Sequence, residues 1–210
     1  MNNHTKRGKF IVFEGCDGSG KTTQMKLLSK FLEGKGEPCY STHEPTDSPF
    51  GALLRSCLTG RIEADEKAIA ALFAADRLDH ITNGVNGIKK KLDEGVNVLC
   101  DRYYFSSLAY NGEFVPFEWV VELNRPAREL LRPDLTLFID LPSEESMKRV
   151  ARRGETERYE TAAKQKKIRE RFFEAFKRFP EEKVVIVTSE EDKDKTQAKI
   201  REAVLPLFGL

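Results

Sequence analysis

The sequence predicts an α/β protein built on a parallel β-sheet with helices on both faces. Two features of the 210 residues indicate this fold. Five short segments of strand character alternate along the chain with longer segments of helical periodicity. The strand-like segments are largely apolar rather than alternating with polar residues, so we expect them to be buried on both faces, as in parallel sheets.

The five predicted strands come in an order that leaves room for a helix after each one. They are Lys9–Glu14, Glu37–Glu44, Val96–Cys100, Leu135–Leu141 and Lys183–Val187. Because each pair of strands is separated by a long connection, neighbouring strands can run parallel.

The connections carry the predicted helices. In Gly20–Glu33, apolar residues fall on one face and glycines follow the last turn. Ala64–Asn83 opens with acidic residues, which suit a helix N-terminus. Ser143–Arg153 opens with a serine cap. The remaining predicted helices are Phe50–Leu58, Val85–Glu94, Phe105–Asn111, Phe117–Leu131, Arg158–Phe179 and Asp192–Leu207.

The composition is that of a globular protein, with 40% hydrophobic and 33% charged residues. A net charge of +1 excludes a globally basic nucleic-acid coat protein and a globally acidic tail protein. No apolar run approaches the roughly 18–20 residues that span a membrane. The four cysteines are far apart and show no metal-binding spacing. We therefore expect a cytoplasmic protein with a disordered tail at residues 1–8 and one domain at 9–210, without a membrane or nucleic-acid partner.

The segment Gly15–Thr22 fits the phosphate-loop pattern G-x-x-x-x-G-K-[ST] between a predicted strand and a predicted helix. Glycines let backbone N–H groups turn toward phosphate oxygens, and the helix N-terminus adds positive potential. Lys21 would reach the β and γ phosphates, and Thr22 would give its hydroxyl to Mg²⁺. The expected nucleotide-phosphate ligands are Gly15, Cys16, Asp17, Gly18, Ser19, Gly20, Lys21, Thr22 and Thr23.

Two residues inside this loop have side chains that do not suit phosphate. The carboxylate of Asp17 would repel a phosphate, so it should face an acceptor substrate or the solvent. Cys16 lies near Lys21 and a helix N-terminus, which could favour a thiolate. A small neutral side chain is the simpler interpretation of Cys16.

A second group of candidates follows the predicted strand Val96–Cys100. In open parallel sheets, sites lie at the carboxyl ends of the strands. There Asp101 could hold Mg²⁺ and Arg102 could contact a phosphate with its planar fork. A strand-end ion pair is the alternative interpretation. Ser106 and Tyr110 lie one and two turns further along a predicted helix.

Phe73 and Arg77 are four residues apart and therefore share a helix face. A ring for stacking and a guanidinium for carbonyl oxygens together could bind a nucleobase, although such a phenylalanine is more often a core residue. Glu44 ends the second predicted strand and could orient an arginine. Arg55 is a further candidate phosphate ligand.

The segment Lys148–Arg171 is strongly basic, with ten Lys or Arg and four Asp or Glu residues. Within it, residues 149–160 are predicted to form a small basic lid over a phosphoryl donor, because a mobile arginine can stabilise the transferred group and a lid excludes water. A solvated basic face is the alternative. Nucleic-acid binding is a third possibility, which the scarcity of interleaved aromatic residues disfavours.

The motifs FEGCDGSGKTTQ, HEPTDSPFG, LFAADR, DRYYFSSLAY, PDLTLFIDLP and RRGETERYE, taken in this order, resemble the thymidylate kinase family of P-loop nucleoside monophosphate kinases. The resemblance runs from Phe10 to the last predicted helix. It implies Mg²⁺-dependent transfer of the ATP γ-phosphoryl to dTMP, giving dTDP. It also implies a three-layer P-loop NTPase fold with strand order 2-3-1-4-5, and a homodimer.

The resemblance also implies roles for single residues, position by position. Phe73 would stack on thymine and Arg77 would contact its edge. Asp17 would hold the sugar 3′-hydroxyl, and Asp101 would lie near Mg²⁺. The other implied dTMP contacts are the phosphate ligands Arg102 and Arg55, the strand-end Glu44, the pocket residues Ser106, Tyr110 and Tyr159, and Tyr103, which would crowd a ribose 2′-position.

Three positions depart from the pattern. Some relatives have a phosphate-loop arginine where this chain has Gly18, so the catalytic arginine is expected in the lid: Arg153 first, then Arg152 or Arg158. His43 stands where many relatives have arginine. Leu108 stands where some have a polar residue, which would leave more of the base discrimination to Arg77.

Two other functions stay open on the sequence alone. A kinase of another nucleoside monophosphate, or of a deoxynucleoside, would share the fold; a deoxynucleoside kinase needs a carboxylate base, for which Glu44 is a candidate. A nucleotide-binding regulatory module would share the phosphate loop. A GTPase is disfavoured because the sequence lacks an N-K-x-D guanine motif.

Overall fold

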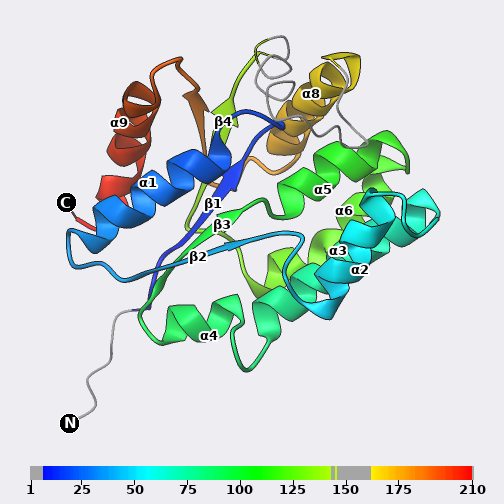
Figure 1. The fold of residues 1–210 in the computed structure, drawn as a ribbon, viewed down its shortest axis with the longest axis horizontal. Helices are drawn as coiled ribbons and strands as arrows, with labels where there is room; N and C mark the ends of the chain where they lie inside the picture. Colours follow the sequence, from blue (N-terminus) through cyan, green and yellow to red (C-terminus); the bar gives the residue numbers. More distant parts are fainter. Residues whose placement is uncertain (1–6, 143–144, 146–161, 210) are drawn as a thin grey trace.

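The computed structural model describes residues 7–142, 145 and 162–209. Its centre is one five-stranded sheet with the order β2-β3-β1-β4-β5, and every neighbouring pair of strands is parallel (Figure 1). The strands are β1 (Phe10–Glu14), β2 (Cys39–His43), β3 (Asn97–Asp101), β4 (Leu135–Asp140) and β5 (Val184–Thr188). The predicted parallel sheet and its strand order are confirmed.

Helices cover the sheet on both sides (Figure 1). The α-helices are α1 (Lys21–Glu33), α2 (Pro49–Leu58), α3 (Glu66–Thr82), α4 (Ile88–Asp93), α5 (Tyr104–Tyr110), α6 (Phe117–Leu130), α8 (Ala162–Arg178) and α9 (Lys193–Val204). Two short 3₁₀ helices, η1 (Asn111–Glu113) and η2 (Leu205–Leu207), extend α5 and α9. Among the described helices, none is long and apolar enough to cross a membrane.

The alternation of side chains along β1 divides the core into two layers. Ile11 and Phe13 pack in one cluster with apolar residues of α1 and α9. Phe10 and Val12 pack in the other cluster, with residues of α3, α4, α5, α6 and α8. All five residues of β1 are buried, which explains why this strand is apolar on both faces.

Several element ends differ from the prediction, and three of the differences have local reasons. β2 begins at Cys39 rather than Glu37, because Pro38 has no N–H for the ladder. α4 begins at Ile88, because the Asn83 side chain accepts the Val85 N–H and forms a turn before it. α9 ends at Val204 and gives way to η2 at Leu205, one residue before Pro206, which cannot continue an α-helix. Most of the predicted helix 143–153 lies outside the described residues, and so does the whole of the predicted lid, residues 149–160.

The fold brings polar groups together at the carboxyl edge of the sheet. β1 ends at Glu14, β3 ends at Asp101 and β4 ends at Asp140. At the opposite edge, Arg7 donates to Asp134 and the Gly8 N–H donates to the Leu92 carbonyl, so these two residues of the predicted tail lie against the sheet. The carboxyl edge is the place where an open parallel sheet carries its site.

Candidate active site

The loop between β1 and α1 is shaped by glycines in left-handed backbone conformations. The φ angles are +146° at Gly15, +76° at Gly18 and +96° at Gly20. A Cβ atom on Gly15 would lie 2.6 Å from the Ile139 carbonyl oxygen, so only glycine fits there. This backbone can turn its N–H groups toward an anion at the N-terminus of α1.

Lys21 is the first residue of α1, and its side chain folds back over the loop. Its Nζ donates to the carbonyl oxygens of Gly15 and Cys16, at 3.0 and 2.9 Å. Burial, and to a smaller extent the charge of Arg102, lower the pKa of Lys21. The ammonium group therefore lies inside the loop that would hold the phosphates.

Thr22 and Asp101 form the part of the site that suits a metal. The Thr22 hydroxyl donates to Asp101 Oδ2 at 2.6 Å. The other carboxylate oxygen, Oδ1, is buried and has no hydrogen-bond partner among the described residues. A hydroxyl and an unsatisfied carboxylate oxygen are ligands that fit a hard divalent cation. The two residues thus fit the metal that their sequence context predicts.

Arg102 is the centre of a polar network at the end of β3. Its guanidinium donates to Asp17 Oδ1, to Ser106 Oγ at 3.2 Å and to the Tyr110 hydroxyl at 3.4 Å. The Tyr110 hydroxyl and the Gln165 amide donate to the second oxygen of Asp17, at 3.0 and 3.1 Å. Four residues predicted from the sequence are thereby brought together.

The charge of Asp17 is stabilised by this network. Burial alone would raise the pKa of Asp17, but the positive charges of Arg102 and Lys21 outweigh burial and hold that pKa below its usual value. Arg102 itself has a positive φ of 73°, which is rare for a residue with a side chain. Such strain persists only where the surroundings hold it, and it is common at functional sites.

A buried ion pair lies on the other side of the site, between β2 and α3. Glu44 Oε2 accepts from Arg77 Nε at 2.8 Å and lies 2.7 Å from its Nη2. Arg77 also donates to Ser107 Oγ at 3.0 Å and to Asn124 Oδ1. With 1% of its surface exposed, Arg77 needs these acceptors to keep its charge in the interior.

Most of these groups border one cleft of about 550 Å³. Its lining comes from the phosphate loop, from α1 and from the carboxyl ends of β2 and β3. The predicted site residues in the lining are Asp17, Gly18, Gly20, Lys21, Thr22, Thr23, Glu44, Asp101 and Arg102.

A model of the thymidylate kinase family matches residues 13–200 of the chain. The chain belongs to the thymidylate kinase family. It is 44% identical over 186 residues to a probable thymidylate kinase of Thermococcus onnurineus, which covers 84% of this chain and 88% of the relative. A probable thymidylate kinase of Thermococcus kodakarensis is 40% identical over 210 residues, covering 95% and 98%. The thymidylate kinase of Pelotomaculum thermopropionicum is 40% identical over 194 residues, covering 89% and 88%.

Three residues that the resemblance to thymidylate kinases places at the acceptor lie elsewhere than in the Arg102 network. Phe73 packs beside the apolar cluster between α2 and α3. Arg55 donates to the carbonyl oxygens of Pro45 and Thr46, just after β2. Tyr103 is a core residue, 1% exposed, whose hydroxyl donates to the Leu131 carbonyl at 3.0 Å.

Leu108, which stands where some relatives have a polar residue, is fully buried in the core. The polar side chain that faces Arg77 from α5 is Ser107, one position earlier. Cys16, for which the neutral form was the simpler of the two interpretations, is a protonated thiol, because burial raises its pKa to about 12. The lid residues Arg149, Arg152, Arg153, Arg158 and Tyr159 lie outside the described residues.

Several residues of the site were not found from the sequence, because their partners are far away along the chain. Glu14 accepts from the N–H groups of Tyr103 and Ser106 at the start of α5. Asp76 accepts from the backbone and hydroxyl of Thr46 and so fixes the loop after β2. Asn124 and Gln165 are further examples, as partners of Arg77 and Asp17. The one signal in the sequence for Glu14 was its place in an apolar strand, where its carboxylate was expected to be buried.

Proposed function

We propose that this member of the thymidylate kinase family transfers the γ-phosphoryl group of ATP to a 5′-phosphate oxygen of dTMP, giving dTDP and ADP. The observation that supports it most is the shared cleft, in which Lys21 and the phosphate loop face Arg102 and Asp17. The loop suits a triphosphate, and the Arg102–Asp17 pair suits a phosphorylated sugar. The relatives that cover most of this chain carry the name thymidylate kinase.

In this proposal the donor phosphates bind to the backbone of residues 15–20 and to Lys21 and Thr23. Thr22 and Asp101 would hold Mg²⁺, which when bound neutralises charge on the phosphate oxygens. Arg102, with Arg55 as a second ligand, would hold the acceptor phosphate, and Asp17 would accept a hydrogen bond from the sugar hydroxyl. Both phosphates would then lie at the carboxyl ends of β1 and β3.

For the base we propose stacking on Phe73 and a hydrogen bond from Arg77 to a thymine carbonyl oxygen. Arg77 Nη2 carries two hydrogens, and Glu44 Oε2 at 2.7 Å is its one acceptor among the described residues. A donor is therefore available for a carbonyl group. Ser106, Tyr110 and Tyr159 complete the proposed pocket, with Tyr103 behind it.

The transfer needs positioning and charge stabilisation rather than a general base, because a phosphate acceptor is already ionised. Glu44, the candidate base for a deoxynucleoside acceptor, has one oxygen on Arg77 and the other on His80. This engagement favours a monophosphate over a nucleoside acceptor. A lid arginine, Arg153 first and otherwise Arg152 or Arg158, would stabilise the charge of the transferred group and exclude water.

We further propose that residues 9–210 act as one kinase domain with a lid at about 149–160. We also propose that the enzyme is a cytoplasmic homodimer that binds no nucleic acid.

Release of ADP from ATP and Mg²⁺, with dTMP, dUMP, UMP, AMP, GMP and thymidine offered separately, tests this function. A strong preference for dTMP is the expected result. Faster turnover with another monophosphate would overturn the pocket assignment while leaving the mechanism intact. Thymidine as the best acceptor would overturn the monophosphate assignment, and acceptor-independent turnover would favour a regulatory nucleotide-binding module.

A further inference from the structure

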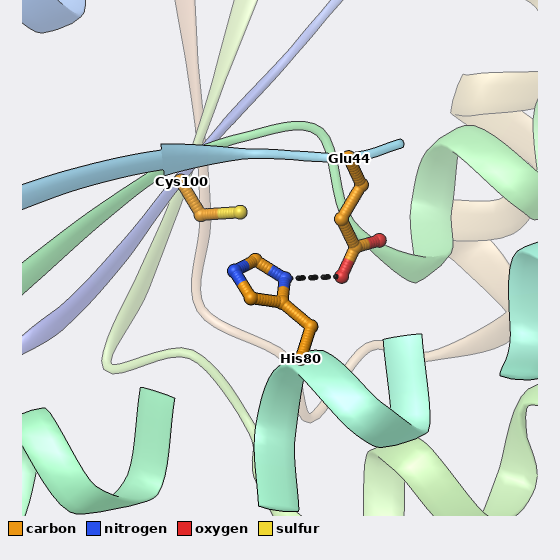
Figure 2. Close-up of side chains that lie close together, drawn as sticks. All are labelled: Glu44, His80 and Cys100. Atoms are coloured by element: carbon orange, nitrogen blue, oxygen red, sulfur yellow. Dashed lines mark hydrogen bonds and ion pairs between the residues drawn. The ribbon is translucent and has the colours of Figure 1, made fainter. Parts of the chain in front are cut away.

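Three side chains of metal-binding type lie together beneath β2, namely Glu44, His80 and Cys100, with ligand atoms all within 4.8 Å of one another (Figure 2). Their contacts do not fit a metal centre. Both Glu44 oxygens are engaged, by Arg77 and by His80. The Cys100 thiol donates to the Arg102 carbonyl at 3.0 Å, and burial raises the pKa of this thiol well above its usual value. The thiol is protonated, the Glu44 carboxylate is already paired, and the Arg77 guanidinium lies beside it. This set of side chains therefore does not bind a cation.

The imidazole of His80 instead connects β2 to the buried carboxylate. Figure 2 shows the ring reaching from α3 toward Glu44, to which its Nδ1 is joined at 3.0 Å. Its Nε2 lies 2.8 Å from the Thr42 hydroxyl. Because an ionised carboxylate only accepts hydrogen bonds, Nδ1 must carry a hydrogen. In the neutral ring Nε2 then accepts from Thr42.

This contact fixes a torsion that is otherwise soft. The carboxylate of a glutamate rotates in a broad, roughly two-fold energy well. In Glu44 one oxygen is held by His80 and the other by Arg77, so the plane of the carboxylate is held from both sides. Because Arg77 is hydrogen-bonded to this carboxylate, the orientation of its guanidinium depends on the carboxylate plane. Ser107 and Asn124 accept hydrogen bonds from the other edge of the guanidinium. The direction of the remaining Nη2 hydrogen therefore depends on His80.

We propose that His80 is a positioning residue for pyrimidine selection: through Glu44, it holds Arg77 in the orientation that donates to a carbonyl group at position 4 of the base. The inference rests on the proposed role of Arg77 in base binding. A correctly aimed N–H group accepts thymine, whose position 4 carries a carbonyl oxygen. It rejects cytosine, whose amino group is itself a donor.

Two isosteric changes separate the contacts of His80. His80→Asn retains an amide N–H near the position of Nδ1, and therefore the contact with Glu44. His80→Gln instead places its amide near Nε2 and retains the contact with Thr42 only. Thr42→Val removes the hydroxyl on the far side of the ring and is the matched control. Each variant is assayed for kcat and KM with dTMP and with dCMP, and its free energy of unfolding is measured by denaturant.

We expect His80→Gln to raise KM for dTMP about 10-fold, in the range found for residues that orient a ligand, with kcat changed by less than about 2-fold. We also expect it to lower the preference for dTMP over dCMP by a similar factor. His80→Asn and Thr42→Val should keep both quantities near wild type. If His80 had a structural role alone, the two His80 variants would differ from wild type in the free energy of unfolding but not from each other in KM. Equal KM values and equal selectivity for His80→Gln and His80→Asn would overturn the proposal.

Arg77→Gln, measured in parallel, distinguishes this failure from a failure of the proposed function. If Arg77→Gln leaves KM and the dTMP to dCMP ratio unchanged, the proposed base contact is wrong. If Arg77→Gln changes both while His80→Gln changes neither, the base contact stands and the positioning role of His80 is wrong.

Discussion

Glu14 and Ser106 are joined by two hydrogen bonds, although 92 residues separate them. Glu14 Oε1 accepts the Ser106 N–H at 3.0 Å, and Oε2 accepts the Ser106 hydroxyl. Ser106 Oγ in turn accepts from Arg102, whose backbone is strained. The last residue of β1 thus holds the first turn of α5 against Arg102.

The first prediction concerns the pH dependence of stability. Burial raises the pKa of Glu14 from 4.5 to about 7, even though its hydrogen bonds with Ser106 and the charge of Arg102 oppose the change. The folded state therefore binds more protons than the unfolded state between these values, so the contribution of Glu14 to the free energy of unfolding falls as the pH rises from about 4.5 to 7 and is lost above that window. The expected loss is on the order of 3 kcal/mol.

Glu14→Gln removes the titrating group and keeps an acceptor for the N–H groups of Tyr103 and Ser106. We expect its free energy of unfolding to fall less than that of the wild type between pH 5 and pH 8, as measured by urea denaturation at each pH. Parallel curves for the two proteins would contradict the prediction. Glu129→Gln, at an exposed position of α6, serves as the control, because it also replaces one carboxyl group by an amide.

The second prediction concerns the metal. Thr22→Ala and Asp101→Asn each remove one proposed oxygen ligand, so we expect kcat to fall by about 100-fold or more and the Mg²⁺ concentration at half-maximal rate to rise. Thr22→Ser retains the hydroxyl and should stay close to wild type. The measurement is the rate of ADP release across a Mg²⁺ titration. An unchanged Mg²⁺ dependence in both variants would show that these residues do not hold the ion.

The third prediction concerns the acceptor phosphate. Arg102→Lys keeps the positive charge but loses the planar fork that contacts Asp17, Ser106 and Tyr110. We expect KM for dTMP to rise about 10-fold or more while KM for ATP changes little. The matched control is Arg125→Lys on the exposed face of α6. A larger effect on ATP than on dTMP would place Arg102 on the donor side.

The fourth prediction concerns the lid. Arg153→Ala is expected to lower kcat by about 1,000-fold, the scale found when a mobile arginine is lost from phosphoryl transfer, with KM for dTMP nearly unchanged. Arg152→Ala and Arg158→Ala should have smaller effects. Steady-state rates for the three variants rank them directly. If none of the three lowers kcat, the catalytic arginine lies outside the lid.

The sequence was sufficient for the features that depend on local chemistry. The phosphate-loop pattern at Gly15–Thr22 carries its own backbone constraints, because the left-handed conformation of Gly15 is needed to approach Ile139. The strands β1, β3, β4 and β5 were recognisable as short, largely apolar runs, whereas β2 has the more polar sequence CYSTH and is only partly buried. The proximity of Asp101 to Thr22 also followed from the rule that parallel strands end at one edge.

The remainder of the site depends on contacts and on helical phase that a single sequence does not specify. Ser107 was not singled out as a partner of Arg77, although Ser106 and Leu108 on either side of it were discussed; one residue turns a helical side chain by about 100°. The packing of Tyr103 against Phe10, far away along the chain, likewise had no local signal in the sequence. His80 had no local signal at all, since its partners are Thr42 in β2 and Glu44 directly after that strand.

The burial of the Cys16 thiol lowers its reactivity toward alkylating and oxidising reagents. Alkylating reagents, peroxides and disulfides react with the thiolate form, and a pKa of about 12 leaves almost none of it at neutral pH. Cys39 and Cys100 are protected in the same way by raised pKa values. The phosphate-loop sequence thus carries a sulfur atom at Cys16 without becoming a point of oxidative inactivation.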